Sequence, residues 1–282
     1  MTLPNFIGIG APKSGSTWLY ELLRKHPDVY MPEIRKELDF FNFDSNYSKG
    51  LSWYESFFPK SELADNYKAI GEFTPRYIEQ PEKCAKRIAN IKSVNKLIVI
   101  LRNPVNRTYS QYCHGVRSGS TKSFESLLSE KPWLIEHGLY ARNLKPFLNF
   151  YSREQILCLI FEESVKNIEV TKSKLAEFLQ VSVDKFAQTG ALPKVNQSYV
   201  PKFRQINNLA GIINRSLVKS DLDWVIKVGN RLGIRQMLAI GAKPIPPLSE
   251  STKLRLQEAF ANDIEELEKL LNLSLDIWKT NS

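Results

Sequence analysis

The 282-residue sequence predicts a single α/β domain, in which helices flank a central parallel sheet and a helical cap follows at the C-terminus. Two observations predict this class. Short apolar segments alternate with segments of helical periodicity through the first 185 residues, as in strands joined by crossover helices. Beyond residue 185 the helical periodicity continues without a strong strand. We therefore expect an α/β core over residues 1–185 and a mainly helical region over residues 186–282.

The first strand and the first helix flank a glycine-rich turn. The apolar segment 5–10, "NFIGIG", predicts a buried strand that ends at glycine. The segment 16–26, "STWLYELLRKH", places its apolar residues at helical spacing. The chain is thus expected to begin as strand, turn and helix.

Three more buried strands are expected, and helices follow two of them. The clearest strand is 95–104, because Leu97 to Leu101 are all apolar and suit a strand that is covered on both faces. The other expected strands are 67–75 and 153–164, and the expected helices are 105–119 and 170–181.

The last hundred residues have helical character. Residues 199–238 show helical periodicity, and 241–249 form a proline-rich segment that we expect to be extended. Residues 249–278 predict a long amphipathic helix. Its apolar side is expected to carry Leu254, Phe260, Ile264, Leu267 and Leu271.

Charge and cysteine content narrow the possible partners and location. The net charge of +9 favours an anionic partner, but no run of five basic residues exists, which argues against nucleic-acid binding. The three cysteines lack metal-type spacing and are expected to be reduced. The first residues lack the features of a signal peptide, and no stretch of 18 apolar residues occurs. We expect a cytoplasmic protein without a membrane partner.

The segment 7–19, "IGIGAPKSGSTWL", contains an altered phosphate-binding loop. Gly10 and Gly15 have the spacing of the G-x-x-x-x-G-K-[ST] pattern, and Thr17 occupies its hydroxyl position. Ser16 stands where the pattern has lysine, and Lys13 comes three residues earlier. A glycine-rich turn that leads into a helix N-terminus offers backbone N–H groups and a positive dipole end to an anion.

The missing lysine and a missing aspartate together indicate which kind of anion binds to the loop. Nucleotide hydrolases hold magnesium with the loop hydroxyl and with an aspartate at the end of a nearby apolar strand. Here that strand ends in Arg102, a fixed cation. We therefore expect a site that works without a metal ion and binds a nucleotide with phosphates at two separate places.

Four segments resemble one enzyme family. "APKSGSTWL" (11–19) is similar to the 5′-phosphosulfate loop of sulfotransferases that use 3′-phosphoadenosine 5′-phosphosulfate (PAPS). "LRNPVNRTYSQY" (101–112) is similar to their 3′-phosphate motif, an arginine with a serine eight residues later. "KELDFF" (36–41) and "GEFTPRY" (71–77) resemble segments of the glycosaminoglycan-type branch. The resemblance covers residues 5–180 well and the final helix loosely.

The resemblance implies a P-loop-NTPase-like fold, with PAPS as sulfuryl donor and 3′-phosphoadenosine 5′-phosphate (PAP) as product. Lys13 would stabilise the leaving group. Trp18 matches an indole that stacks on adenine, although an ordinary buried helix aromatic is equally consistent. Arg107 either helps to bind the 3′-phosphate or is a solvated helix residue. The implied cofactor-binding residues are Lys13, Ser14, Gly15, Ser16, Thr17, Trp18, Arg102 and Ser110.

Two residues are candidates for the general base that the acceptor requires. Glu37 matches the glutamate with this role in the glycosaminoglycan-type branch, and the alternative is that it only pairs with Lys36 or Arg35. His114 lies four residues after Ser110 and matches a histidine at that offset in the N-sulfating relatives. The catalytic set is therefore expected to be Lys13, Glu37 and His114.

The "GEFTPRY" segment departs from the family at one position. Phe73 replaces the family's lysine, so Arg76 or Lys36 would have to supply the charge, and Glu72 is a candidate for orienting the site. The resemblance to bacterial sulfotransferases implies an acceptor hydroxyl or amine on a small molecule, such as a secondary metabolite. The alternatives are a carbohydrate acceptor, a P-loop small-molecule kinase and a non-catalytic nucleotide-binding module.

Overall fold

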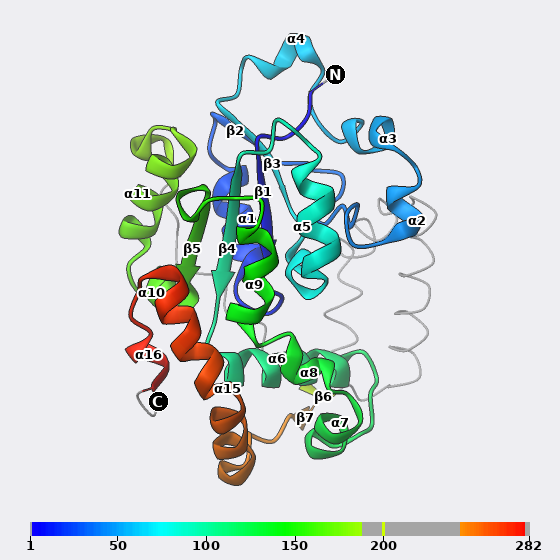
Figure 1. Cartoon of the computed structure of the whole chain (residues 1–282), viewed down its shortest axis with the longest axis vertical. Coiled ribbons are helices and arrows are strands. Elements are labelled where there is room, and N and C mark those ends of the chain that lie inside the picture. Colours follow the sequence, from blue (N-terminus) through cyan, green and yellow to red (C-terminus); the bar gives the residue numbers. More distant parts are fainter. Residues whose placement is uncertain (1, 188–198, 201–242, 280–282) are drawn as a thin grey trace.

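The computed structural model describes residues 2–187, 199–200 and 243–279. Its centre is a five-stranded sheet in the order β2-β3-β1-β4-β5, and every pair of neighbouring strands is parallel (Figure 1). This confirms the expected fold class. In chain order the strands are β1 (Phe6–Gly10), β2 (Val29–Tyr30), β3 (Ala69–Phe73), β4 (Lys96–Leu101) and β5 (Ile156–Ile160).

The middle strands are apolar because both faces of the sheet are covered. Every residue of β1 and β3 is buried, as are the five residues of β4 from Leu97 to Leu101. One face packs against helices α1 and α11, and the other packs against α5, α9, α15 and α16 (Figure 1). These helices are α1 (Ser16–Arg24), α5 (Pro81–Ala89), α9 (Tyr140–Leu148), α11 (Ile168–Leu179), α15 (Glu250–Leu271) and α16 (Asp276–Lys279).

Shorter elements complete the described part of the chain. The remaining α-helices are α2 (Asp44–Tyr47), α3 (Leu51–Glu55), α4 (Ser61–Ala64), α6 (Pro104–Arg117), α7 (Phe124–Glu130), α8 (Trp133–Glu136) and α10 (Phe161–Lys166). The 3₁₀ helices are η1 (Pro75–Glu79), η2 (Arg153–Gln155) and η3 (Val183–Lys185). Strands β6 (Tyr199–Val200) and β7 (Lys243–Pro244) form an antiparallel pair.

The structure corrects two details of the expected elements. The strand expected over 153–164 ends at Ile160, because Glu162 and Glu163 start helix α10, where acidic side chains suit the helix N-terminus. On α15, Leu254 is 62% exposed and Leu256, which lies about 200° further around the helix, is 1% exposed. Leu256 therefore takes the core-facing position that was expected for Leu254.

The described part of the predicted C-terminal region packs on the core. Helix α15 contacts α9, and its Leu267 and Leu271 belong to the same buried cluster as strand β4. The helical periodicity expected over 199–238 falls outside the described residues, apart from 199–200. Cys84, Cys113 and Cys158 are free thiols. Within the described ranges, no helix combines the length and the apolar character needed to cross a membrane.

The direction of winding reverses between the carboxyl ends of β1 and β4. After β1 the chain crosses toward β2 and β3, whereas after β4 it crosses toward β5. In open parallel sheets, ligands bind where the direction of winding reverses in this way. The loop after β1 and Arg102 after β4 both lie at this point, next to the start of α6 (Figure 1).

Candidate active site

Residues 11–17, which comprise the loop after β1 and the first residues of α1 and are here named the anion loop, have a backbone that only particular residues can adopt. Lys13 and Gly15 both have left-handed φ angles, of 67° and 95°. A Cβ on Gly15 would lie 2.4 Å from a ring carbon of Phe161, so glycine is required there. Gly15 is also the N-cap of α1 and offers no side chain to the first N–H groups of the helix. Those groups are available to an anion.

Ser14 is a buried hydroxyl without a well-formed hydrogen bond. Its side chain is fully buried, and Oγ has no hydrogen-bond partner within the described residues. Burial raises the pKa of Tyr140 to about 12, and the neighbouring Arg107 guanidinium and Ser14 hydroxyl oppose that rise. An unpaired buried hydroxyl is costly unless a ligand supplies a partner. The loop therefore fits a polar ligand such as a phosphate or sulfonate.

Lys13 lies among other cations. Its pKa is lowered to about 8, first by burial and then by the charges of Arg117, Arg107 and Lys36, while Glu37 opposes the fall. Like charges held together disfavour the charged form of the lysine. An anion placed among them would reverse that effect. The electrostatics of the anion loop thus favour a negatively charged ligand.

Arg102 reaches the anion loop from the neighbouring strand. Its Nη1 donates to the Lys13 carbonyl over 3.4 Å, and its guanidinium lies 5.4 Å from the centre of the Phe161 ring. Asn103 follows and caps α6 by accepting from the N–H groups of Val105 and Asn106. Ser110 lies in the second turn of α6 and is partly buried. The structure therefore brings Arg102 to Lys13 and places Ser110 on the helix that starts beside them.

Arg107 is not a solvated helix residue, which was one of its two expected roles. Its side chain is fully buried, and its guanidinium donates to the Pro12 carbonyl over 3.3 Å and to the Leu134 carbonyl over 3.3 Å. It also forms an ion pair with Glu79 over 3.1 Å. Arg107 therefore braces the anion loop from behind, a role that its position in an ordinary helix pattern does not indicate.

Glu37 is linked to the anion loop through its neighbour. Lys36 Nζ donates to Thr17 Oγ1 over 2.9 Å and to Glu37 Oε1 over 3.2 Å. Glu37 keeps 35% of its side chain exposed. The expected alternative, a pairing of Glu37 with Lys36, is thus present. The same lysine also contacts Thr17 of the anion loop, so Glu37 both pairs with Lys36 and lies close to the site.

The other sequence candidates lie in different surroundings. His114 is exposed on α6. Trp18 is partly buried against the core beneath α1, and Ser16 is buried in the first turn of that helix. Arg117, which sequence reasoning missed, lies at the last turn of α6 and has the largest effect of any charge on the pKa of Lys13. The sequence signal for Arg117 was its position seven residues after Ser110, which places both residues on the same side of the helix.

The structure shows the surroundings of Phe73 and of the two residues expected to replace the family's lysine. Phe73 is fully buried, and its ring occupies the space that a Cβ on Gly8 would enter at 2.2 Å. Phe73 therefore belongs to the core. Arg76 pairs with Asp39 over 2.6 Å. Lys36 is the candidate that reaches the anion loop.

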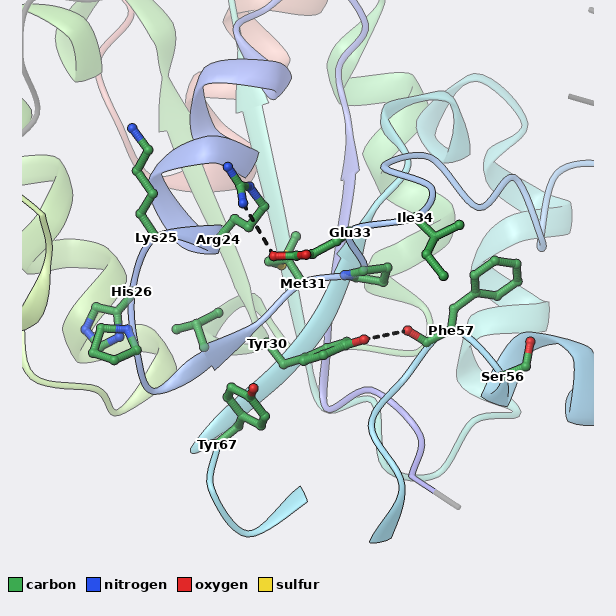
Figure 2. A pocket seen from close by; sticks show the side chains of 13 residues that line it. Arg24, Lys25, His26, Tyr30, Met31, Glu33, Ile34, Ser56, Phe57 and Tyr67 are labelled. Carbon is green, nitrogen blue, oxygen red and sulfur yellow. Dashed lines mark hydrogen bonds and ion pairs between the residues drawn. The ribbon is translucent and has the colours of Figure 1, made fainter. Parts of the chain in front are cut away.

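A separate pocket lies along the edge strand β2. It has a volume of about 590 Å³ and is lined by residues of the α1 end, β2 and the segment around Phe57 (Figure 2). Arg24 and Glu33 pair across it over 3.5 Å, and the Tyr30 hydroxyl donates to the Phe57 carbonyl over 3.0 Å. The pocket shares no lining residue with the anion loop. In the described ranges, no group of three His, Cys, Asp or Glu side chains could hold a metal ion.

A family model for the sulfotransferase domain matches residues 3–217. The chain belongs to the sulfotransferase family. This match sets aside the kinase interpretation of the loop.

Individual relatives are sulfotransferases of several kinds. Heparan sulfate glucosamine 3-O-sulfotransferase 3B1 of Mus musculus is 34% identical over 207 residues, which cover 68% of this chain and 51% of the relative. Membrane-associated sulfotransferase kil1 of Dictyostelium discoideum is 40% identical over 143 residues, which cover 48% of this chain and 30% of the relative. The sulfotransferase chain described here thus matches about half of these relatives' length, or less.

A solved sulfotransferase has the same fold. The crystal structure of a sulfotransferase from Alicyclobacillus acidocaldarius superposes with a TM-score of 0.68 at 23% identity. The superposition covers 99% of this chain and 100% of that one. At this identity, the likeness supports the fold alone.

Proposed function

We propose that this sulfotransferase moves a sulfuryl group from PAPS to a hydroxyl or amine of its acceptor. The observation that carries the proposal is the anion loop, with its unpartnered Ser14 and its partly buried Lys13, beside Arg102 at the point where the sheet reverses its winding. When bound, PAPS would supply the activated sulfuryl group, with PAP as the leaving product.

Lys13 would stabilise the charge that develops on the leaving oxygen. Transfer of this type passes through a loose transition state in which charge builds up on that atom. The left-handed backbone of Lys13 fixes where its side chain starts, and the surrounding cations leave it short of a counter-ion. A positioned cation of this kind stabilises a transition state without rearrangement.

The remaining loop residues and Arg102 would hold the nucleotide. Ser14, Gly15, Ser16 and Thr17 would donate to the 5′-phosphate and the sulfonate, since Ser14 and the start of α1 lack other partners for these groups. Arg102 and Ser110 would bind the 3′-phosphate, and Trp18 the adenine. We propose that no metal ion takes part.

Glu37 would take the proton from the acceptor. Its carboxylate is joined to the anion loop through Lys36 and stays partly exposed, so an acceptor can reach it. His114, which is exposed on α6, is the second candidate base.

The acceptor is proposed to be a small molecule, such as a secondary metabolite. A carbohydrate acceptor is the second candidate, and the 34% identity to a heparan sulfate glucosamine 3-O-sulfotransferase favours it. Radiolabelled PAPS with p-nitrophenol, an aliphatic alcohol, an aliphatic amine and desulfated heparan sulfate separates these classes. Label transferred to the carbohydrate alone would contradict the small-molecule assignment.

Titration calorimetry tests nucleotide binding directly. We expect PAP to bind at least about tenfold more tightly than AMP or ATP, because only PAP engages Arg102 and Ser110 as well as the anion loop. Binding should persist in EDTA. Arg102→Ala should reduce the preference for PAP over AMP, whereas Lys60→Ala, which removes a charge at α4 on the opposite end of the molecule from α6 (Figure 1), should not. Equal affinity of the wild-type protein for PAP and AMP would contradict the proposal.

A further inference from the structure

Three consecutive backbone N–H groups follow Glu37, and two hydroxyls from a distant segment bind all three. The N–H groups of Leu38 and Asp39 donate to Thr74 Oγ1 over 3.0 Å and 3.3 Å. The N–H of Phe40 donates to the Tyr77 hydroxyl over 3.2 Å. Residues 36–41, here named the KELDFF segment, contain no strand or helix, so these bonds replace the ladder that would otherwise fix the backbone.

Both hydroxyls donate a hydrogen bond to one buried carboxyl group. Thr74 Oγ1 donates to Glu72 Oε2 over 2.7 Å, and the Tyr77 hydroxyl donates to Glu72 Oε1 over 2.6 Å. A hydroxyl has one proton, so a hydroxyl that accepts from the backbone can direct that proton to only one partner. Glu72, Thr74 and Tyr77 are all fully buried.

We propose that Glu72 is the positioning residue of the active site and acts on the candidate base Glu37 through Thr74 and Tyr77. The inference rests on the proposed function, because it assigns Glu72 to the reaction of that site. Asp39 has a left-handed φ of 53°, a conformation that a non-glycine residue keeps only when its surroundings hold it. The bonds to Thr74 and Tyr77 hold the residues on both sides of that strained position. Glu37, one residue before them, is thereby kept beside Lys36 and the anion loop.

The arrangement requires a carboxyl group and would not tolerate an amide. A carboxylate accepts at both oxygens, and the hydroxyl oxygen of a protonated carboxyl group still accepts. An amide nitrogen cannot accept. Glu72→Gln would therefore satisfy Thr74 or Tyr77 but not both, although it changes neither size nor shape.

A matched pair of tyrosines tests the proposal. Tyr54 and Tyr77 are both fully buried, and both hydroxyls donate to Glu72 Oε1, Tyr54 over 3.4 Å. Only Tyr77 also accepts from the KELDFF backbone. We expect Tyr77→Phe to lower kcat by about 10- to 100-fold while the KM for PAPS and the Kd for PAP stay within about twofold. Tyr54→Phe should change kcat by less than about threefold. Thr74→Val should behave like Tyr77→Phe, and Thr74→Ser should restore most of the rate.

The rate is measured with radiolabelled PAPS and p-nitrophenol, or with desulfated heparan sulfate where only that acceptor is active. Hydrogen exchange of the Leu38, Asp39 and Phe40 amides gives a second reading that needs no turnover. Tyr77→Phe should speed their exchange and Tyr54→Phe should not. Equal kcat and equal exchange in the two variants would overturn the positioning role. If the wild-type protein transfers no sulfuryl group while the two variants still differ in amide exchange, the proposed function is overturned and the hydrogen-bond arrangement stands.

Discussion

The anion loop and the KELDFF segment both contribute to the candidate site, but they are fixed in different ways. The anion loop follows local signals: a buried strand enters it, Gly15 supplies a positive φ, and helix α1 begins after Gly15, while Arg102 and Arg107 brace it through the carbonyls of Lys13 and Pro12. The KELDFF segment has no regular structure, and side chains about 35 residues further along the chain hold it. The binding half of the site is therefore encoded locally, and the half that carries the candidate base depends on tertiary contacts.

The two regions also differ in charge. Lys13 in the anion loop is surrounded by Arg117, Arg107 and Lys36. The KELDFF segment carries Glu37 and Asp39, and burial raises the pKa of Asp39 against the opposing effect of Arg76. Cations thus gather around Lys13, and the KELDFF segment adds two acidic residues beside Lys36. This suits a reaction in which an anion binds on one side and a proton leaves on the other.

The largest effect expected from breaking the anion loop is on rate. Lys13→Ala should lower kcat by about 10²- to 10³-fold, because it removes a preorganised charge from the leaving group. The Kd for PAP should change far less, since Ser14, the start of α1 and Arg102 remain. Steady-state kinetics with calorimetry measures both quantities. Near wild-type turnover in the variant would remove Lys13 from its assigned role.

A smaller effect is expected from the carboxyl group behind the KELDFF segment. Burial raises the pKa of Glu72 from 4.5 to about 8, while hydrogen bonds from Tyr77 and Thr74 oppose the rise. The folded protein therefore holds this proton more tightly than the unfolded chain, so the contribution to stability is largest below pH 4.5 and falls as the pH rises toward 8.

Chemical denaturation at several pH values measures this slope. Between pH 5 and 8 the wild-type free energy of unfolding should lose on the order of 1–3 kcal/mol relative to Glu72→Gln, whose amide does not titrate. Parallel curves for the two proteins would show that Glu72 does not titrate in this range.

The smallest effect expected is on the pH dependence of nucleotide binding. Lys13, with a pKa lowered to about 8 by burial and neighbouring cations, loses its charge above that pH. The neutral lysine offers the anion one cation less, so the Kd for PAP should weaken by up to about threefold in total, because Ser14, the start of α1 and Arg102 still bind. Calorimetry from pH 7 to 9.5 measures this trend, and Lys13→Ala should flatten it. A wild-type Kd that stays constant across this range would contradict the lowered pKa.

The sequence predicts the parts of the fold and site that local rules determine. Strand β4 was predicted because Leu97 to Leu101 form an apolar run, and Arg102 was singled out because it ends that run. The anion loop was predicted because glycine at residue 15 and a helix start are local features. The two-residue strand β2 gave no signal, since two residues are too few to show alternation.

The parts that sequence reasoning missed depend on contacts between distant segments. Arg107 has the spacing of a solvated helix residue, and only the packing of α8 and Glu79 around it makes it a buried brace. Glu72 was noted as a candidate for orienting the site. Its connection to Leu38, Asp39 and Phe40 through two hydroxyls could not be predicted, because it joins segments about 35 residues apart. The roles of Glu37 and His114 stay predictions.

Initial rates of sulfuryl transfer in three proteins test the central claim most directly. The wild type, Glu37→Gln and His114→Asn are compared with radiolabelled PAPS and the best acceptor of the panel, with PAP binding and melting temperature as controls. The account predicts transfer by the wild type, a loss of about 10²-fold or more in Glu37→Gln with unchanged PAP binding, and measurable activity in His114→Asn. Activity retained in Glu37→Gln and lost in His114→Asn would contradict the account and make His114 the base.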